Sequence, residues 1–137
     1  MVQKRNQGFS LVELIIVIAI MAILIGVLAP QYVKYVEKSR ASADEDLADT
    51  LLTAGYLMAA DEDYADGLVS GDKIILSHSG IQITETNNMV SAGLNEFAPA
   101  WKNKKSTSKT YGARQYIVEF KGGAGNKGFT VEGSWQP

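Results

Sequence analysis

An apolar run from Leu14 to Ala29 constrains this chain more than any other feature of its sequence. Including the residues just before it, the stretch 9–29 carries only two polar side chains, Ser10 and Glu13. As an α-helix, a stretch of this length reaches about 30 Å, which is the hydrocarbon thickness of a bilayer. The run therefore predicts a helix that spans a membrane.

The carboxylate of Glu13 does not fit an ordinary membrane anchor. An acidic side chain near the bilayer centre costs about 2.5 to 3.5 kcal/mol, and somewhat less nearer the end of the helix. Cleavage between Gly8 and Phe9 would supply a partner, because the new α-amino group of Phe9 would lie four residues before Glu13 on the same helical face. The two charges could neutralise each other within one chain or between neighbouring chains. The simpler alternative is that Glu13 lies at headgroup depth and is solvated there.

Residues 4–20, Lys-Arg-Asn-Gln-Gly-Phe-Ser-Leu-Val-Glu-Leu-Ile-Ile-Val-Ile-Ala-Ile, resemble the N-terminus of a type IV prepilin or a related pseudopilin. The resemblance implies that prepilin peptidase, a membrane aspartic peptidase, removes residues 1–8 and methylates the amine of Phe9. It implies that Glu13 then aligns each incoming subunit with the one before it. It also implies that the apolar helices of many copies leave the bilayer, with the help of the pilus assembly machinery, and pack as the core of a helical filament.

A conventional secretory signal is the competing interpretation of these residues. Such a signal is cut after its apolar segment and discarded. Here the junction of Gly8 and Phe9 precedes the apolar segment, and Ala29-Pro30 is a poor site of the small-x-small type, so the helix is expected to stay with the mature protein. The basic residues Lys4 and Arg5 predict a cytoplasmic N-terminus. The expected location is the cytoplasmic membrane for the precursor, in a single pass, and an extracellular filament after assembly.

The helix is expected to continue past Pro30 and to run from about Phe9 to Ala60. Proline removes an intrahelical hydrogen bond and clashes with the carbonyl four residues earlier, which belongs to Gly26. Residues 26–30 are therefore the expected place for a kink, and the resemblance implies a melted segment there in the filament.

From residue 31 to residue 60 the pattern stays helical and becomes amphipathic. The apolar positions of the stripe are Tyr32, Val36, Ala43, Leu47, Leu51, Ala54 and Met58. The charged positions, expected on the other faces, are Lys34, Glu37, Lys38, Arg40, Asp44, Glu45 and Asp49. The stripe must be covered, and the C-terminal part of the chain is the expected cover.

Residues 61–137 are expected to form a headpiece with antiparallel strands. The expected elements are strands at 72–77 and 81–84, a helix from Met89 to about Phe97 capped by Asn87-Asn88 and ended by Pro99, a strand at 111–120, a glycine-rich turn at 121–128 and a return strand at 129–135. In the first strand of the last hairpin, Tyr116, Val118 and Phe120 share one face. The predicted fold class is α+β, with a sheet of three or four strands packed on residues 32–58 of the long helix, as in type IV pilins.

Composition excludes several classes of function. The chain has 137 residues, one histidine and no cysteine, so it has no disulfide, thiolate metal site or cysteine nucleophile. This departs from the many Gram-negative pilins that close a C-terminal loop with a disulfide. His78 has no second ligand nearby in sequence, and no nucleophile–base pair is evident, so neither an enzyme nor a cofactor is predicted. The net charge of −2 argues against a surface that coats nucleic acid.

Two clusters in the headpiece could bind a ligand. The segment Asp61–Gly67 has the acid density of a calcium loop but the wrong spacing, so a solvated acidic loop is the preferred interpretation and no metal is predicted. The one basic cluster with aromatic neighbours consists of Trp101, Lys102, Lys104, Lys105 and Lys109. It could contact single-stranded nucleic acid or an acidic surface, but a solvated loop is again the simpler interpretation.

The sequence thus predicts a structural protein that assembles with copies of itself into a filament of the type IV pilus kind. A pseudopilin of a type II secretion or DNA-uptake machine remains the alternative, and the N-terminal motif does not separate the two. A monomeric binding module, anchored by an uncleaved leader, is the second alternative.

Overall fold

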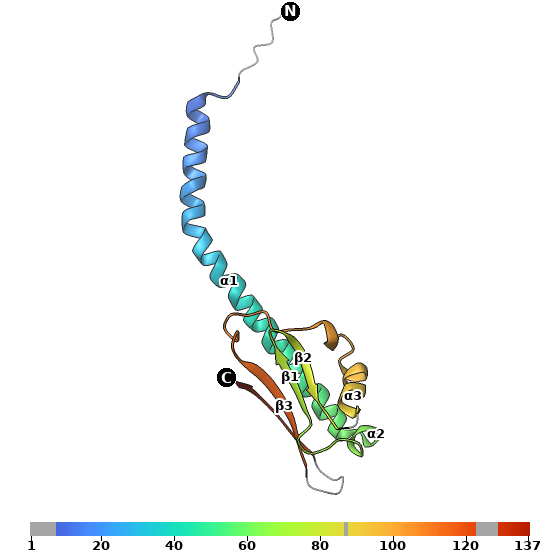
Figure 1. Cartoon of the computed structure of the whole chain (residues 1–137). Helices are drawn as coiled ribbons and strands as arrows, with labels where there is room; N and C mark the ends of the chain where they lie inside the picture. The colour runs from blue at the N-terminus through green and yellow to red at the C-terminus, as the bar shows by residue number, and fades with distance from the viewer. Residues whose placement is uncertain (1–7, 87, 123–128) are drawn as a thin grey trace, which may run out of the picture. The chain divides into compact units, whose positions relative to one another are not determined.

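The computed structural model describes residues 8–86, 88–122 and 129–137. The leader residues 1–7, Asn87 and most of the expected glycine-rich turn lie outside the described residues. The chain divides into two compact units that meet between Val36 and Glu37. We call residues 37–137 the globular unit; its elements are coloured from blue-green to red in Figure 1.

Helix α1 runs without interruption from Leu11 to Ala60, with Pro30 inside it. The expected helix from about Phe9 to Ala60 is therefore confirmed to within two residues. Residues 26–30 are helical in the single chain, so a melted segment at Gly26 and Pro30 stays a prediction for the assembled filament. Every side chain from Gly8 to Tyr35 is exposed.

The globular unit adds a small antiparallel sheet and three short helical elements to the second half of α1 (Figure 1). In chain order these are α2 (Glu62–Ala65), β1 (Lys73–Ser77), β2 (Gly80–Thr84), α3 (Met89–Phe97), the 3-10 helix η1 (Trp101–Asn103), β3 (Gln115–Lys121) and β4 (Thr130–Gln136). The strand order is β2-β1-β3-β4, and each neighbouring pair is antiparallel. The α+β prediction and both hairpins are confirmed.

The core lies between α1 and one face of the sheet. Tyr116, Val118 and Phe120 of β3 are all buried, as their alternation predicts, and Leu51 and Met58 of α1 belong to the same cluster. Gly55 lets the two layers approach closely, because a Cβ at this position would lie 3.0 Å from Val131 Cγ1. Large side chains of α1 thus fill the core on either side of Gly55, where the helix backbone itself lies close to the sheet.

The predicted apolar stripe of α1 is partly wrong. Asp44, placed on a polar face, is 2% exposed, and Ala48 is also buried, whereas Tyr32 and Ala43 are exposed. Periodicity assigns a carboxylate to the solvent face because burying it without hydrogen-bond partners is expensive. Asp44 escapes that rule because a distant loop supplies its partners, as described below.

Helix α3 has the predicted bounds but not the predicted cap. Asn88 adopts a left-handed backbone conformation, with φ of 60°, and its side chain makes no capping hydrogen bond. The carboxylate of Glu85 accepts from the backbone N–H of Ser91 instead, at 3.0 Å. A side chain from before the helix thus satisfies one of the N–H groups that the first turn leaves free.

Candidate functional site

The start of α1 is a reciprocal capping arrangement between Ser10 and Glu13. The backbone N–H of Ser10 donates to Glu13 Oε2 at 2.8 Å, and the N–H of Val12 donates to Ser10 Oγ at 3.3 Å. The first helical hydrogen bond runs from Leu14 N to Ser10 O at 3.2 Å. Each polar side chain therefore satisfies an N–H group that a helix start cannot pair within itself.

This capping role for Glu13 was not anticipated from the sequence, although its signal is present. Ser-x-x-Glu before an apolar run is the pattern of a capping box, and Ser10 to Glu13 matches it. The arrangement points the carboxylate of Glu13 back toward residue 10, which is one residue from Phe9. The acid within the apolar run thus has a structural partner in the uncleaved chain.

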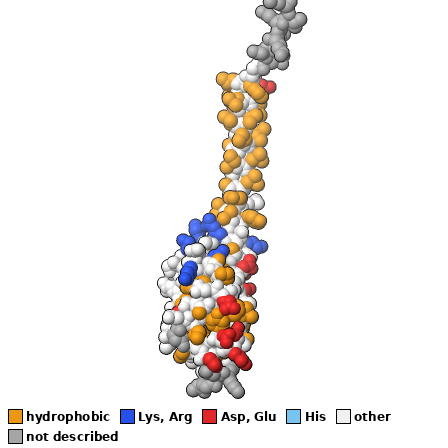
Figure 2. Space-filling view, turned by 90° about the vertical axis from the view of Figure 1, so that its right-hand side faces the viewer, with side chains coloured by type: hydrophobic (Ala, Val, Ile, Leu, Met, Phe, Trp, Pro, Cys, Tyr) orange, Lys and Arg blue, Asp and Glu red, His pale blue; other side chains and the backbone are white. Residues whose placement is uncertain are grey.

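The apolar part of α1 is uncovered by the rest of the chain. None of the most apolar window of the helix is buried, and Leu11 and Ile23 are 72% and 67% exposed. Figure 2 shows this surface as continuous hydrophobic side chains. By length and composition α1 is the one helix among the described residues that is able to span a membrane. An apolar surface of this size must be covered by lipid or by other proteins.

A polar clasp holds the loop after η1 against α1 in the globular unit. Asp44 of α1 accepts hydrogen bonds from Ser106 Oγ at 2.7 Å, from Thr107 N at 2.9 Å and from Ser108 N at 2.8 Å. Ser106 and Ser108 are buried with it. A buried carboxylate with three close donors is stable where an unpaired one would not be, because charge-assisted hydrogen bonds replace its hydration.

A second carboxylate, Glu37, extends the clasp by two turns of helix. Its Oε1 accepts from Ser108 Oγ at 2.7 Å and from Thr110 N at 2.9 Å. These two hydrogen bonds, that from Ser108 first, lower the pKa of Glu37 below its ordinary value. The chain has no cysteine, so no disulfide can close this long loop. Hydrogen bonds to α1 hold the loop in place instead.

Tyr111 anchors the last part of the same loop. Its hydroxyl donates to Glu45, and this hydrogen bond, followed by burial, raises the pKa of Tyr111. Its ring stacks on Trp135 with centroids 4.1 Å apart. The expected strand from residue 111 begins only at Gln115, because the residues before it form turns: Gly112 N donates to Lys109 O and Arg114 N to Tyr111 O.

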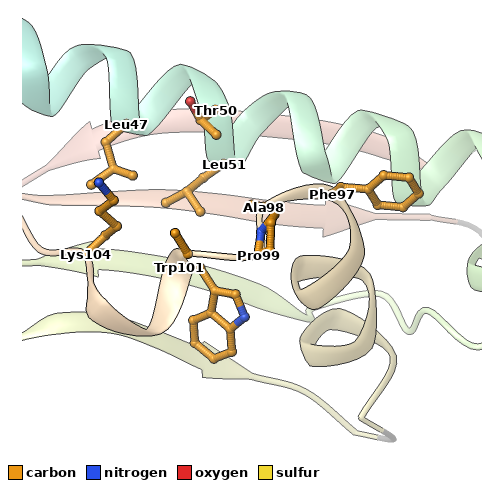
Figure 3. A pocket seen from close by; sticks show the side chains of 9 residues that line it. Leu47, Thr50, Leu51, Phe97, Ala98, Pro99, Trp101 and Lys104 are labelled. Atoms are coloured by element: carbon orange, nitrogen blue, oxygen red, sulfur yellow. The ribbon is translucent and has the colours of Figure 1, made fainter.

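The five residues of the predicted basic cluster lie on η1 and the clasped loop. Lys102, Lys104, Lys105 and Lys109 are exposed, whereas Trp101 is half-buried. The indole N–H of Trp101 donates to Asn95 Oδ1 at 3.0 Å, and its ring points away from α1 in Figure 3. The cations therefore share one surface, but Trp101 is engaged by α3.

An apolar groove of about 240 Å³ lies between α1 and the segment that follows α3. Figure 3 shows Leu47, Leu51 and Lys104 along it, with Pro99 where the chain leaves α3. Its volume is below the range of about 300 to 1,000 Å³ typical of ligand pockets. The groove is therefore smaller than a typical ligand pocket.

The acidic segment Asp61–Gly67 is explained by helix formation. Asp61 is the N-cap of α2, and its carboxylate accepts from Asp63 N at 2.9 Å. No group of acidic, histidine or cysteine side chains able to hold a metal ion occurs in the part of the chain that the structure describes. Residues 62–65 are therefore a short capped helix where a loop was expected.

Taken together, the uncovered apolar half of α1 and the α+β globular unit define a class of protein. It is a protein with a helix long and apolar enough to cross a membrane, whose apolar surface lipid or other proteins must cover. Comparison with known proteins identifies the family.

Residues 3–29 match the family described as the prokaryotic N-terminal methylation motif. Fimbrial protein EcpC of Eikenella corrodens is 33% identical over 139 residues, which cover 96% of this chain and 84% of that protein. Prepilin peptidase-dependent protein A of Clostridium perfringens is 34% identical over 83 residues, or 59% of each chain. Type IV major pilin protein PilA of Myxococcus xanthus is 36% identical over 63 residues, 45% of this chain and 29% of its own length. No solved structure matches the chain.

The chain belongs to the type IV pilin family, which includes the fimbrial proteins. The resemblance seen in residues 4–20 is thus confirmed, and so is the prediction that the protein is not an enzyme, because proteins of this family are structural subunits. The chain spans only part of the other two relatives: 59% of the Clostridium protein and 29% of the Myxococcus protein.

Proposed function

We propose that this protein is the structural subunit of a type IV pilus-like filament, assembled through the apolar half of α1 after its leader is removed. The observation that carries the proposal is the complete exposure of that half-helix in the single chain. In the bilayer, lipid covers this surface; in a filament, the same surface of neighbouring subunits covers it. Burial of apolar area is favourable in both, so transfer between them exchanges one cover for another.

The proposed processing divides the chain at the junction of Gly8 and Phe9. A prepilin peptidase would release residues 1–8 as the leader and methylate the amine of Phe9. Residues 9–30 would serve first as the membrane span and then as filament core, and residues 31–60 would continue the helix into the headpiece at 61–137. A match to the N-terminal methylation motif over residues 3–29 supports this division.

Orientation of the precursor follows from the processing motif rather than from a count of charges. Lys4 and Arg5 precede the span, but Lys34, Lys38 and Arg40 follow it closely. Basic residues therefore flank both ends, and the cytoplasmic N-terminus expected from Lys4 and Arg5 stays a prediction. We place the N-terminus in the cytoplasm because the leader must meet its peptidase there.

Glu13 is proposed to have two roles, which can be separated. Its carboxylate caps α1 through Ser10 in the uncleaved chain. After cleavage, the amine of Phe9 would lie beside it, in the same chain or in a neighbouring one, and the pair would restrict the register in which a subunit enters the filament. Glutamine can replace glutamate in a capping box but carries no charge.

The experiment compares Glu13→Gln and Glu13→Ala in the native cell envelope. Leader cleavage and membrane insertion should persist in both, as measured by intact mass and N-terminal sequence. Filament yield, measured by electron microscopy and shearing, should fall strongly in both variants. Wild-type filaments from Glu13→Gln would show that capping suffices and would remove the register role; wild-type filaments from Glu13→Ala would remove both roles.

The two alternative functions give different outcomes in the same preparation. A pseudopilin would be processed at Phe9 but would form no long surface fibres. A monomeric anchored module would keep Met1 and would not self-associate. The names of the relatives, a fimbrial protein and a major pilin among them, favour the pilus subunit.

A further inference from the structure

A hollow of about 430 Å³ in the globular unit is lined by cationic and hydroxyl side chains that the filament proposal does not use. Its lining residues are Arg40 of α1, His78 of the turn between β1 and β2, and Lys105, Ser106 and Thr107 of the clasped loop. No carboxylate lines it. The hydroxyls of Ser106 and Thr107 donate to Asp44, so the groups left for a ligand are the guanidinium of Arg40 and the ammonium of Lys105. These two cations are the chemistry that recognises a phosphate group.

The surroundings of the hollow are basic as well. Residues 37–45 and 101–114, which we call the basic end, contain seven Lys and Arg side chains and three acidic ones. The remainder of the globular unit contains three basic and eleven acidic side chains. Figure 2 shows Lys and Arg gathered at one end of the globular unit, with most Asp and Glu away from it. A chain of small net charge thus carries two surfaces of opposite sign.

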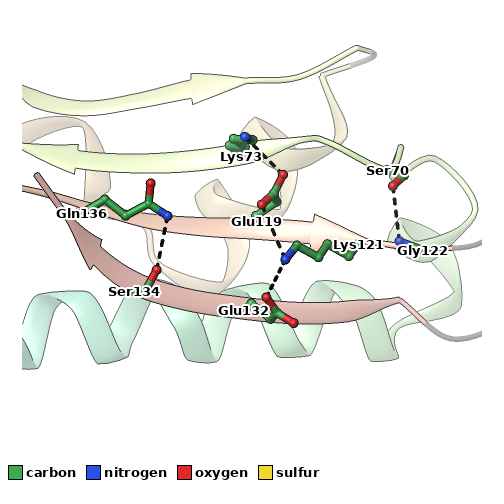
Figure 4. A network of polar contacts seen from close by, with 8 residues as sticks. All are labelled: Ser70, Lys73, Glu119, Lys121, Gly122, Glu132, Ser134 and Gln136. Carbon is green, nitrogen blue, oxygen red and sulfur yellow. Dashed lines mark hydrogen bonds and ion pairs between the residues drawn. The ribbon is translucent and has the colours of Figure 1, made fainter.

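The cations of the basic end are not neutralised by the chain itself. The ion pairs among the described residues all lie on the sheet: Lys73 with Glu119 at 3.1 Å, and Lys121 with Glu132 at 2.6 Å and Glu119 at 4.0 Å (Figure 4). At the basic end, the buried acid Asp44 accepts from neutral hydroxyl and amide donors instead. The clasp therefore turns the hydroxyls of the loop inward and leaves Lys105 and Lys109 exposed.

The tether to the membrane span limits what these cations can meet. Glu37, where the basic end begins, follows Ala29 by eight residues. Eight residues reach about 12 Å as a helix and at most about 28 Å fully extended. The headgroup layer adds about 5 to 7 Å to each side of the hydrocarbon core. Helix α1 is continuous here, so Arg40 lies about 16 Å along the helix from Ala29, or about 10 Å beyond the headgroup layer for a helix along the membrane normal. That distance is about one Debye length at physiological salt, so the charge of the headgroups acts on the basic end of the membrane-anchored precursor.

We propose that the hollow at Arg40, His78 and Lys105 binds the phosphate headgroup of an anionic phospholipid in the outer leaflet, with Lys109 on the same surface. This inference rests on the proposed membrane-anchored precursor. Basic residues near an anionic surface are attracted to it, and this attraction is lost when the subunit leaves the bilayer. Single-stranded nucleic acid fits the site less well, because Trp101, the aromatic side chain of the cluster, is half-buried and has Lys102 Nζ over its ring, 5.6 Å from the centroid, where a base would stack.

The test uses the full chain in nanodiscs of phosphatidylcholine alone and of two parts phosphatidylcholine to one part phosphatidylglycerol. A membrane-impermeant amine-acylating reagent is applied, and the rate at each lysine is read by mass spectrometry. Lys105 and Lys109 should react about three-fold more slowly in the anionic discs, because a surface potential of about −30 mV favours the unreactive, protonated amine by that factor. High salt should abolish the difference.

Lys73 and Lys121 provide internal controls at the far end of the sheet. Ser77, at the other end of β1 from Lys73, bonds to Ser106 of the clasped loop, and the strand between them is about 13 Å long. The acylation rates of both control lysines should be equal in the two kinds of disc. Equal rates for Lys105 in the two discs, or an equal decrease at Lys73, would overturn the proposal.

Two further arms identify the source of the phosphate. Inorganic phosphate or a single-stranded oligonucleotide added to phosphatidylcholine discs should not protect Lys105; protection by either would overturn the lipid assignment. The double variant Arg40→Gln, Lys105→Gln should lose the lipid-dependent protection of Lys109, whereas Lys73→Gln should retain it. A chain that does not insert into nanodiscs refutes the proposed membrane precursor, whereas an inserted chain without protection refutes only this inference.

Discussion

Replacement of Asp44 by alanine tests whether the polar clasp holds the globular unit together. The side chain is 2% exposed and accepts from Ser106 Oγ, Thr107 N and Ser108 N, all within 2.9 Å. Alanine would leave two backbone N–H groups and a buried hydroxyl without their acceptor. It would also remove the hydrogen bonds at Asp44 that hold α1 to a loop more than sixty residues away in the chain.

The size of the effect follows from these contacts. A hydrogen bond to a charged acceptor contributes about 1.5 to 3 kcal/mol, and part of this returns when the freed loop meets water. We expect Asp44→Ala to lower the free energy of unfolding by about 3 to 5 kcal/mol. Asp44→Asn keeps one acceptor oxygen and turns an amide toward the N–H groups, so it should lose about half of that.

Urea unfolding of the full chain in detergent micelles measures the change. Trp101 and Trp135 lie beside the two ends of the loop and report its release through their fluorescence. With a urea dependence of about 1.5 kcal/mol per molar, the midpoint should fall by about 2 to 3 M. Asp49→Ala is the matched control, since Asp49 is an exposed acid on the same helix. An Asp44→Ala midpoint equal to that of the control would refute the clasp as a source of stability.

Three further predictions use the same unfolding assay. Gly55→Leu should destabilise by about 2 to 3 kcal/mol through overpacking against β3 and β4. Gly26→Ala should not destabilise, because nothing lies within 4 Å of the added Cβ and alanine favours a helix more than glycine does; equal losses of stability would contradict the close packing at Gly55. Phe120→Ala should lose about 3 to 5 kcal/mol by opening a cavity in the core, and a loss under 1 kcal/mol would mean that the core is loose. Glu37 has a lowered pKa, so the stability it contributes is present above its ordinary value of 4.5 and is lost as the pH falls through the lowered value. Glu37→Gln should therefore destabilise at pH 6 and converge on the wild type in strong acid; a constant difference would argue against this hydrogen-bonding role.

The long helix and the class of fold could be predicted because their signals are local. The apolar run up to Ala29 requires a helix to pair its backbone groups, whether in lipid or among other helices. The alternation through Tyr116, Val118 and Phe120 fixes the buried face of a strand without reference to any partner. The N-terminal motif identifies the family by the same local means.

Parts of the candidate site could also be predicted, and one part was overlooked. The basic cluster from Lys102 to Lys109 is contiguous in sequence, so its location on one loop follows directly. The reciprocal cap of Ser10 and Glu13 could also have been predicted from the sequence, since both residues lie within a stretch of four. The sequence analysis considered only the charge of Glu13. It therefore missed the hydrogen bond from Ser10 N to Glu13 that the Ser-x-x-Glu pattern predicts.

The sequence by itself determined the long helix, the two hairpins and the family, whereas the tertiary structure decided which residues are buried against which. Three features depend on contacts between segments that are dozens of residues apart. They are the strand order β2-β1-β3-β4, the burial of Asp44, and the hollow lined by Arg40, His78 and Lys105. A carboxylate on a helix is assigned to solvent until its donors are known, and the donors of Asp44 come from a Ser-Thr-Ser run with no periodic signal. Local patterns determine what each segment forms; the balance of desolvation against hydrogen bonds made across the fold decides where a polar group can lie.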